Sequence, residues 1–431
     1  MDLEAARRIV AEWLEEWKPP DLVPREAQPP DLKKLSEILA IVGPRRAGKT
    51  YFMFQMLEDL VRRSVCARDD ILFIDFEDYR LADMTPADID LLFVAFNQLA
   101  GKPPRFLFFD EIQRLPSWSR VLRALHNQRR YKIIVSGSNS ELLGSEVSTE
   151  LRGRYRDLLI LPFSFREICR FRRIRYTPRT FHTAERGQII KAFDDYAREG
   201  GFPELLHKSD ATEKRKLLQN YYQTVFYRDI LERHAVKARP LLEALMRYCV
   251  NTYAELFSVS AFAKHWERQG WPGSKRTIAA YLYYLEEAFF LIAHAKYSYS
   301  PRKRIMNPKK IYLLDPGFSC LATQFSDNRG KILENVVAVE LYRKQREAFY
   351  HKGRKECDFI VLANGKPDEA IQACWELNDR NENREYSGLL EAMKSFQIRK
   401  GTILTYNQES ARRLLGRDIE IFPVWKWLLS N

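Results

Sequence analysis

Residues 43–50 constrain the fold of this chain more than any other stretch, and they read Gly-Pro-Arg-Arg-Ala-Gly-Lys-Thr. They fit the pattern G-x-x-x-x-G-K-[ST], in which glycines let successive backbone N–H groups point at phosphate oxygens. An apolar run at 38–42 precedes the pattern and a helical pattern at 51–57 follows it. That context separates a phosphate-binding loop from a chance match, and the positive N-terminal end of the helix would also face the phosphates.

The loop predicts a nucleoside-triphosphate site with ATP and Mg²⁺ as its ligands. Lys49 would reach the β- and γ-phosphates, and the Thr50 hydroxyl would ligate Mg²⁺. Arg45 and Arg46 could add phosphate contacts or pair with acids such as Asp75, and both alternatives stay open. The predicted nucleotide-binding residues are Gly43, Pro44, Arg45, Arg46, Ala47, Gly48, Lys49, Thr50 and Tyr51.

Strand-like and helical segments alternate after the loop. Apolar runs at 71–76, 106–109 and 132–135 are separated by helical patterns at 86–98 and 119–127. This alternation predicts a parallel sheet with helices on both faces.

The run at 106–109 ends in two carboxylates, Asp110 and Glu111. Ligands of such sheets bind at the carboxyl ends of the strands. Asp110 would therefore hold Mg²⁺ through water, and Glu111 would polarise or orient the attacking water. The next strand ends in a small polar stretch, in which Ser138 or Asn139 would hydrogen-bond the γ-phosphate or the lytic water. A helix N-cap by Ser140 is the simpler alternative for that stretch.

Length and charge limit the remaining possibilities. A chain of 431 residues predicts roughly two to four domains. The net charge of +13 favours an anionic partner such as nucleic acid, although an evenly spread excess would only aid solubility. Six scattered cysteines and seven histidines show no metal-ligand spacing. Without an apolar run of membrane length or a signal-peptide pattern, we expect a cytoplasmic, reduced protein with no membrane partner.

The first thirty residues stand apart from the ATP-binding pattern. Residues 2–17 have apolar positions at helical spacing, and prolines crowd the linker that follows, up to Pro30. Two alternatives stay open: an arm that docks elsewhere, or a frayed terminus.

Several motifs together identify a resemblance. The loop at 43–50, Phe-Asp-Glu-Ile-Gln at 109–113, Leu-Arg-Gly-Arg at 151–154 and Gly-Gly-Phe-Pro at 200–203 resemble a large prokaryotic family of AAA-type ATPases. In that family a winged-helix segment and a C-terminal domain like a restriction endonuclease, of unknown function, follow the ATPase domain. The resemblance implies an α/β fold: a P-loop parallel sheet of AAA type, a helical lid with a winged helix, and a C-terminal α/β domain. The expected boundaries are 1–30, 31–165, 166–239, 240–325 and 326–431.

The resemblance also implies an arginine finger. Arg152 and Arg154 fall just before the predicted fifth strand at 158–161, where AAA-type proteins present an arginine to a neighbour's γ-phosphate. Such a finger implies a homo-oligomer, with a hexamer as one candidate. A surface salt bridge is the alternative, since the chain has 70 Lys and Arg residues.

A winged-helix pattern occupies residues 240–315. It has helices from Pro240 to Leu256, from near Ser258, and over 274–285, followed by strands at 290–293 and 310–314 around a basic loop. Helix three would approach a groove of DNA while cations contact phosphates. Packing within the ATPase lid is the alternative role. The candidate DNA-binding residues are Lys275, Arg276, Arg302, Lys303 and Arg304.

The C-terminal domain departs from the nuclease pattern of the family. Asp358 and Glu334 match its acids, but Gln372-Ala373-Cys374 stands where Glu-x-Lys is expected. An amide is a poor Mg²⁺ ligand, and a thiol cannot replace the lysine ammonium. We therefore predict a catalytically degenerate domain, unless Glu369 or Glu376 substitutes in three dimensions.

Together these patterns predict a Mg²⁺-dependent ATPase acting as an oligomeric motor or remodeller on duplex or branched DNA. One alternative is an ATPase switch that binds a protein partner in signalling or defence. The other is an ATP-gated nuclease.

Overall fold

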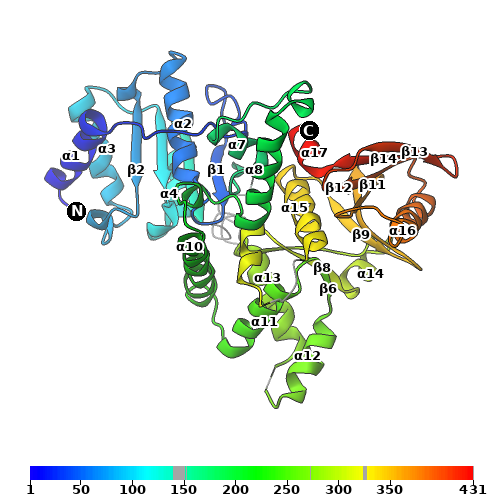
Figure 1. The fold of residues 1–431 in the computed structure, drawn as a ribbon. Helices are drawn as coiled ribbons and strands as arrows, with labels where there is room; N and C mark the ends of the chain where they lie inside the picture. Colours follow the sequence, from blue (N-terminus) through cyan, green and yellow to red (C-terminus); the bar gives the residue numbers. More distant parts are fainter. Residues whose placement is uncertain (139–150, 152, 272, 324–327, 431) are drawn as a thin grey trace. The chain divides into compact units, whose positions relative to one another are not determined.

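The computed structural model describes residues 1–138, 151, 153–271, 273–323 and 328–430. They fall into two compact units, Met1–Pro162 and Phe163–Asn431 (Figure 1). The predictions for Asn139 and Arg152, and that for the side chain of Ser138, lie outside the described residues.

A five-stranded parallel sheet in the order β2-β3-β4-β1-β5 forms the core of the first unit. The strands are β1 (Ile38–Gly43), β2 (Ile71–Asp75), β3 (Phe106–Asp110), β4 (Lys132–Ser138) and β5 (Tyr155–Leu159). The first four are rich in buried apolar residues, as strands covered on both faces require. These four predicted strands are confirmed. The fifth was predicted at 158–161 but begins at Tyr155, because β5 is an edge strand whose polar residues Arg156 and Asp157 hide the pattern.

Helices connect these strands and cover the sheet. They are α2 (Lys49–Arg62), α3 (Asp88–Ala100) and α4 (Trp118–Asn127), with 3-10 turns η2 (Arg68–Asp70), η3 (Tyr79–Leu81) and η4 (Ile112–Arg114).

The N-terminal helix packs against α3 within the first unit, so the alternative of a frayed terminus is wrong. Helix α1 (Leu3–Ala11) lies beside α3 (Figure 1) and continues as the π-helix η1 (Glu12–Glu16). Trp13 donates a hydrogen bond of 2.6 Å from Nε1 to the carbonyl of Ile71 on the edge strand β2, and its ring stacks on Phe73. The guanidinium of Arg68 lies over the Trp13 ring, 4.7 Å from its centroid. Together these contacts cover an edge that would otherwise be open to pairing.

An extended strap, residues 18–34, leads from η1 to the first strand. Arg25 is its anchor: the side chain is buried, and its guanidinium donates to the carbonyl of Ala47 in the phosphate-binding loop, at 2.8 Å. A second N–H of the same guanidinium donates to the carbonyl of Leu161, after β5. The Arg25 backbone N–H donates to the Gln55 side chain on α2. The strap is therefore hydrogen-bonded to the phosphate-binding loop through the carbonyl of Ala47.

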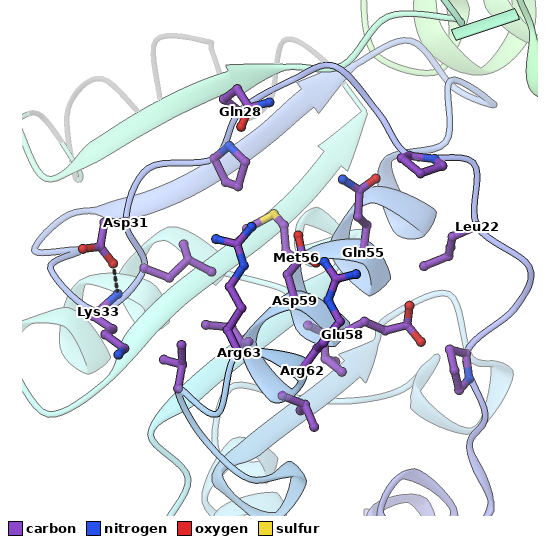
Figure 2. A pocket seen from close by; sticks show the side chains of 18 of the residues that line it. Leu22, Gln28, Asp31, Lys33, Gln55, Met56, Glu58, Asp59, Arg62 and Arg63 are labelled. Carbon is purple, nitrogen blue, oxygen red and sulfur yellow. Dashed lines mark hydrogen bonds and ion pairs between the residues drawn. The ribbon is translucent and has the colours of Figure 1, made fainter. Parts of the chain in front are cut away.

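A groove of about 880 Å³ lies between this strap and α2 (Figure 2). Figure 2 shows Arg62 and Arg63 extending from the end of α2 into it. Arg62 forms an ion pair with Asp59 on the same helix. No residue of the phosphate-binding loop and neither predicted catalytic carboxylate lines the groove, so it is separate from the nucleotide site.

The second unit begins with helices and then forms two sheets. The helical part comprises α7 (Phe165–Phe171), η5 (Thr180–His182), α8 (Glu185–Glu199), α9 (Pro203–Leu206), α10 (Ala211–Thr224) and the π-helix η6 (Val225–Leu231). The three-stranded part comprises α11 (Arg239–Asn251), β6 (Glu255–Phe257), α12 (Val259–Arg268), α13 (Lys275–Glu287), β7 (Leu291–His294), α14 (Pro301–Met306), β8 (Lys309–Leu313) and η7 (Pro316–Leu321).

This three-stranded part has the order of elements predicted for the winged-helix segment, with strands paired as β6-β8-β7. Ser274 caps α13, as expected, by accepting the N–H of Thr277. Two details were wrong. The first helix ends at Asn251 rather than Leu256, because β6 pairs with β8. The basic stretch 301–304 is the start of helix α14 and not a loop.

The C-terminal sheet has six strands in the order β13-β14-β12-β11-β10-β9. Its elements are α15 (Arg329–Arg343), β9 (Ala348–Lys352), β10 (Glu356–Ala363), β11 (Lys366–Ala373), α16 (Glu382–Ser395), β12 (Lys400–Thr405), β13 (Ser410–Leu414), β14 (Arg417–Pro423) and α17 (Val424–Ser430).

The connection between β7 and β8 packs onto this C-terminal sheet. Lys296 forms a β-bridge with Tyr350, and the buried Tyr297 ring packs edge-on against Phe349 and Phe396. The predicted segments 240–325 and 326–431 therefore share a hydrophobic core, and the boundaries drawn between them stay predictions.

The Gly-Gly-Phe-Pro motif is explained by one buried carboxylate. Asp315 accepts hydrogen bonds from the backbone N–H groups of Gly201, at 2.8 Å, and Gly317, at 2.9 Å. Gly200 has φ +83°, and a Cβ there would lie 1.7 Å from an Asp315 oxygen. Only glycine fits this approach.

Candidate nucleotide site and a buried carboxylate cluster

The phosphate-binding loop depends on glycine geometry. Gly43 has φ +150°, and a Cβ there would lie 1.9 Å from the carbonyl oxygen of Ile160. Gly48, just before α2, has φ +90°. The buried Lys49 donates from Nζ to the carbonyls of Gly43 and Pro44, at 3.1 Å each. Its ammonium therefore lies over the loop, where it can meet phosphate oxygens.

The predicted metal residues come together as the sheet order requires. Asp110 ends β3, and Ser136 on the neighbouring strand β4 donates a hydrogen bond to the Asp110 carboxylate. Burial raises the pKa of Asp110 to about 6, while hydrogen bonds from Ser136 and Thr50 oppose that rise. A buried carboxylate beside a threonine hydroxyl is an oxygen donor set that suits Mg²⁺. The residues present therefore fit the predicted metal.

Glu111 has a left-handed backbone conformation, and its carboxylate contacts both Gln113 and Lys49. Its φ of +49° is left-handed, a conformation that costs about 1–2 kcal/mol for a residue with a Cβ. Its backbone N–H donates to the Ser136 hydroxyl at 3.1 Å. Its carboxylate accepts a hydrogen bond from the amide of Gln113 and lies 3.9 Å from the Lys49 ammonium. Strain of this kind is concentrated at functional sites.

Sequence reasoning missed Ser136 and Gln113. Ser136 precedes the positions that were proposed, Ser138 and Asn139, and it directly follows Val135, which pairs with Phe109 next to the end of β3. Gln113 belongs to a motif that was recognised at 109–113, yet no role was assigned to it. The signal available for Ser136 was the order of adjacent parallel strands, and that for Gln113 was its position two residues after Glu111.

The other predicted nucleotide-site residues differ in their contacts and exposure. Arg45 forms an ion pair of 3.7 Å with Glu77, a carboxylate that the sequence analysis did not consider. Arg46 has a left-handed backbone, with φ +64°. Tyr51 is exposed on the first turn of α2. Arg154 stands immediately before β5, where its carbonyl accepts the backbone N–H of Ile38.

The five candidate DNA-binding cations divide into two kinds. Lys275 and Arg276 are exposed on the first turn of α13, and Arg302 and Lys303 are exposed on α14. Arg304 instead donates to the carbonyl of Ser298, and its guanidinium lies over the rings of Tyr297 and Phe349. Arg304 is therefore built into the connection between β7 and β8.

A second polar centre lies in the C-terminal part, around a lysine that sequence analysis did not select. The Nζ atom of Lys310 on β8 lies 2.7 Å from Glu334, 2.9 Å from Glu356 and 2.8 Å from Asp358. The Lys310 side chain is only 4% exposed. We call these four residues the Lys310 cluster. Burial acts against the charge of Lys310, but the carboxylates of Asp358 and Glu334 prevail and hold the pKa of Lys310 well above its usual value.

The amide that replaces the family's glutamate is also engaged. Gln372 on β11 accepts the backbone N–H of Asp358 and donates from Nε2 to Glu385 on α16, at 2.8 Å. Burial raises the pKa of Cys374 to about 11, so this residue is a neutral thiol near pH 7. Neither of the two alternative acids joins the cluster in the described structure: Glu369 pairs with Arg346, and Glu376 contributes only its carbonyl, to Asn381 and Cys374.

Comparisons with known proteins agree with this architecture. A family model described as an AAA domain matches residues 35–169, and a model described as a domain of unknown function (DUF8612) matches residues 190–329. An uncharacterized protein of Methanocaldococcus jannaschii is 33% identical over 407 residues, which cover 92% of this chain and 89% of that protein. The chain belongs to the same family as this archaeal protein, a family of AAA-type P-loop ATPases.

More distant matches extend the comparison. An uncharacterized protein of Haemophilus influenzae is 26% identical over 397 residues, covering 91% of this chain and 94% of that protein. A Walker-type ATPase of Pyrococcus abyssi aligns with a TM-score of 0.43 and 15% identity over 74% of this chain and 95% of that one. The Orc1 protein of Aeropyrum pernix, solved in complex with DNA, aligns with a TM-score of 0.27 and 11% identity over 79% and 94%. Both TM-scores are too low for any detail to be transferred.

None of the helices that the structure describes is both long enough and apolar enough to cross a membrane.

Proposed function

We propose that this protein hydrolyses ATP with Mg²⁺. The observation that carries the proposal is the arrangement at the carboxyl ends of β3 and β4. Asp110 and Glu111 share the Ser136 hydroxyl there, and Glu111 lies 3.9 Å from the phosphate-loop lysine. A metal-holding carboxylate, a water-polarising carboxylate and a phosphate-binding ammonium are the groups that phosphoryl transfer to water needs.

Each residue has a role in this proposal. The loop from Gly43 to Tyr51 would bind the nucleotide, Lys49 would neutralise the β- and γ-phosphates, and Thr50 with Asp110 would hold Mg²⁺. Mg²⁺ would neutralise charge that develops on the phosphate oxygens. Glu111 would orient the attacking water and accept its proton. Ser138 or Asn139 would sense the γ-phosphate.

An arginine finger would complete the site from a neighbouring subunit. Arg154, or Arg152, would stabilise charge on the transferred phosphoryl group, so hydrolysis would require a homo-oligomer, for which a hexamer is one candidate.

We further infer that ATP hydrolysis drives a motor or remodelling activity on duplex or branched DNA. Three observations support this inference: the winged-helix order of α11–β8, four exposed cations on α13 and α14, and a net charge of +13. The first turn of α13 offers Lys275 and Arg276 to phosphates beside a groove. Arg304 is left out of this surface because its guanidinium is engaged within the chain.

The ATPase proposal is tested with a matched pair of carboxylate variants. Glu111→Gln should retain ATP binding and lose hydrolysis by about 10²-fold or more, because the amide cannot accept the proton of water. Glu77→Gln is the control: Glu77 is a nearby carboxylate that pairs with Arg45 and Arg114 but lies outside the Asp110–Ser136 arrangement. Steady-state phosphate release and nucleotide binding are measured for both. Equal rates in the wild type and Glu111→Gln would contradict the proposal.

The DNA proposal is tested by the ATPase rate with no DNA, single strands, duplex and a four-way junction, at low and moderate salt. Stimulation by one form that weakens with salt is expected. Reversing two charges in Lys275→Glu/Arg276→Glu should reduce that stimulation, whereas Lys191→Glu, an exposed charge reversal on α8, should not. A rate indifferent to all DNA forms would refute the motor and direct the search to a protein partner, as for an ATPase switch.

A further inference from the structure

The Lys310 cluster is a complete arrangement around one ammonium. A lysine ammonium has three N–H donors, and Lys310 faces three different carboxylates within 2.9 Å of Nζ. The four residues come from three elements, since Lys310 lies on β8, Glu334 on α15, and Glu356 and Asp358 on β10. All three hydrogens are thus taken inside the protein.

The carboxylates are also engaged by other groups. The second oxygen of Asp358 accepts the backbone N–H of Ala373 at 2.9 Å. Glu334 accepts the Tyr312 hydroxyl at 2.7 Å on the oxygen that faces Lys310. Glu356 also lies 3.3 Å from the Lys352 ammonium. These oxygens therefore have partners without any added ion.

The family resemblance implies a divalent cation at Asp358, held with a carboxylate at position 372. The residues present do not fit that cation. Gln372 supplies an amide whose oxygen and nitrogen are both bonded within the fold, to Asp358 and Glu385. Mg²⁺ requires oxygens at about 2.0–2.1 Å from its centre. The carboxylates here instead stand 2.7–2.9 Å from a central nitrogen.

We propose that the ammonium of Lys310 replaces the divalent cation of the nuclease-like site. This lysine lies on β8 rather than on β11. Its single ammonium takes the place of two positive charges of the family site, the lysine that Cys374 replaces and the divalent cation that a glutamate at position 372 would help to hold. The cluster is then a fixed structural ion centre that joins β8 to α15 and β10. It binds no metal and cleaves no phosphodiester.

The cost of burying charged carboxylates without a cation supports this proposal. Glu334 and Asp358 are buried side by side, and burial together with the Asp358 charge raises the pKa of Glu334 to about 8, so a nearby cation is needed to keep both carboxylates charged. A lysine on an adjacent strand supplies the cation permanently. A dissociable metal would instead make the fold depend on metal concentration. The unpartnered buried cluster that would result from loss of Lys310 should itself attract a divalent ion.

The test uses the full chain without nucleotide and measures Mn²⁺ binding by electron paramagnetic resonance of the free ion. The wild type should show no Mn²⁺ site that depends on Asp358. Lys310→Met removes the ammonium but leaves an unbranched side chain of similar length. This variant protein should bind one Mn²⁺ with a dissociation constant below about 1 mM. Adding Asp358→Asn to Lys310→Met should abolish that gain. Adding Glu369→Gln, a carboxylate on β11 outside the cluster, should not.

Two results would overturn the proposal. One is Mn²⁺ binding or Mn²⁺-dependent cleavage of supercoiled plasmid by the wild type that is lost in Asp358→Asn. The other is a folded Lys310→Met, verified by circular dichroism, that binds no Mn²⁺. If Lys310→Met does not fold, the comparison of wild type with Asp358→Asn still decides, because only a metal-binding site would distinguish them in Mn²⁺ uptake.

Discussion

The side-chain amide of Gln113 donates a hydrogen bond to the carboxylate of Glu111, two residues before it in the chain. Glu111 is the residue immediately before η4, so this contact closes a tight turn directly at the end of β3. On its other side the carboxylate lies 3.9 Å from Lys49. The amide thus fixes the direction of the carboxylate that would face the attacking water.

Gln113→Ala should lower kcat roughly tenfold, a part of the 10²–10⁴-fold that a positioned base contributes. The KM for ATP should stay near the wild-type value, because Gln113 does not belong to the phosphate-binding loop. Gln128→Ala, an exposed glutamine at the end of α4, is the control. Steady-state kinetics separate the two constants. A raised KM with unchanged kcat would show that Gln113 acts on binding and not on Glu111.

Ser136→Ala should impair both stability and turnover. Its hydroxyl donates to Asp110 and accepts the N–H of Glu111, so the alanine leaves two buried polar groups short of a partner. The expected loss of unfolding free energy is about 1–3 kcal/mol. Urea unfolding followed by circular dichroism measures it, with Ser119→Ala on α4 as the control. Full stability and activity in Ser136→Ala would refute the role of this hydroxyl.

Gly200→Ala should destabilise the second unit by roughly 2–5 kcal/mol, combining the left-handed backbone with the clash against Asp315. Gly187→Ala is a matched control on α8, where an added Cβ meets nothing within 4 Å. That change should be neutral or stabilising by up to about 1 kcal/mol, because alanine favours a helix more than glycine does. Thermal unfolding of the two variants should move in different directions. Equal melting temperatures would show that the Asp315 clamp is dispensable.

Trp13→Ala should cost about 3–5 kcal/mol of unfolding free energy, the usual cost of removing a buried tryptophan. It removes the stacking on Phe73, the hydrogen bond to Ile71 and the contact with Arg68 together. Glu16→Ala, on the exposed side of the same segment, should be near neutral. An unchanged denaturation midpoint in Trp13→Ala would mean that the segment detaches in solution.

His294 should make the protein acid-sensitive. The residue is buried opposite Lys310 on the β7–β8 pair, and burial, with the nearby Lys310 charge, lowers the pKa of His294 to about 3. In the unfolded chain the pKa is near 6.5, so the unfolded state binds the proton more tightly. The stability that His294 contributes is therefore complete above about pH 6.5 and is lost as the pH falls towards 3.

The measurement is the free energy of unfolding of the wild type minus that of His294→Gln, as a function of pH. This difference should fall by about 1.4 kcal/mol per pH unit below pH 6. His182→Gln, an exposed histidine, should leave the pH dependence of the wild type unchanged. A difference that stays flat between pH 6 and 4 would show that His294 protonates freely in the folded protein.

The sequence was informative where a local pattern and a structural requirement coincide. The loop at 43–50 lies between an apolar strand and a helix, and further apolar strands lead to Asp110 and Ser136. These patterns were enough to predict the parallel sheet and the proximity of Thr50 to Asp110. The fifth strand was misplaced because an edge strand tolerates Arg156 and Asp157. Its apolar end was therefore taken for its beginning.

Long-range partners could not be predicted. Lys310 reaches Asp358 across 48 residues and from a strand assigned to a different segment, so no motif spacing could indicate it. Ser136 depends on the register of β3 with β4, and Arg25 depends on the course of an extended segment with no periodicity. Each of these side chains acts through tertiary contacts that local propensity does not encode.

The strap at 18–34 sets where this ATPase unit begins. The matched AAA domain starts at residue 35, yet Arg25 holds the loop carbonyl of Ala47 and Trp13 covers the edge of β2. A fragment cut at the start of the matched domain would expose Phe73 on an edge strand and free the back of the phosphate loop. Such a fragment should therefore be prone to aggregation through that edge and should bind nucleotide weakly, although its recognised motifs are intact.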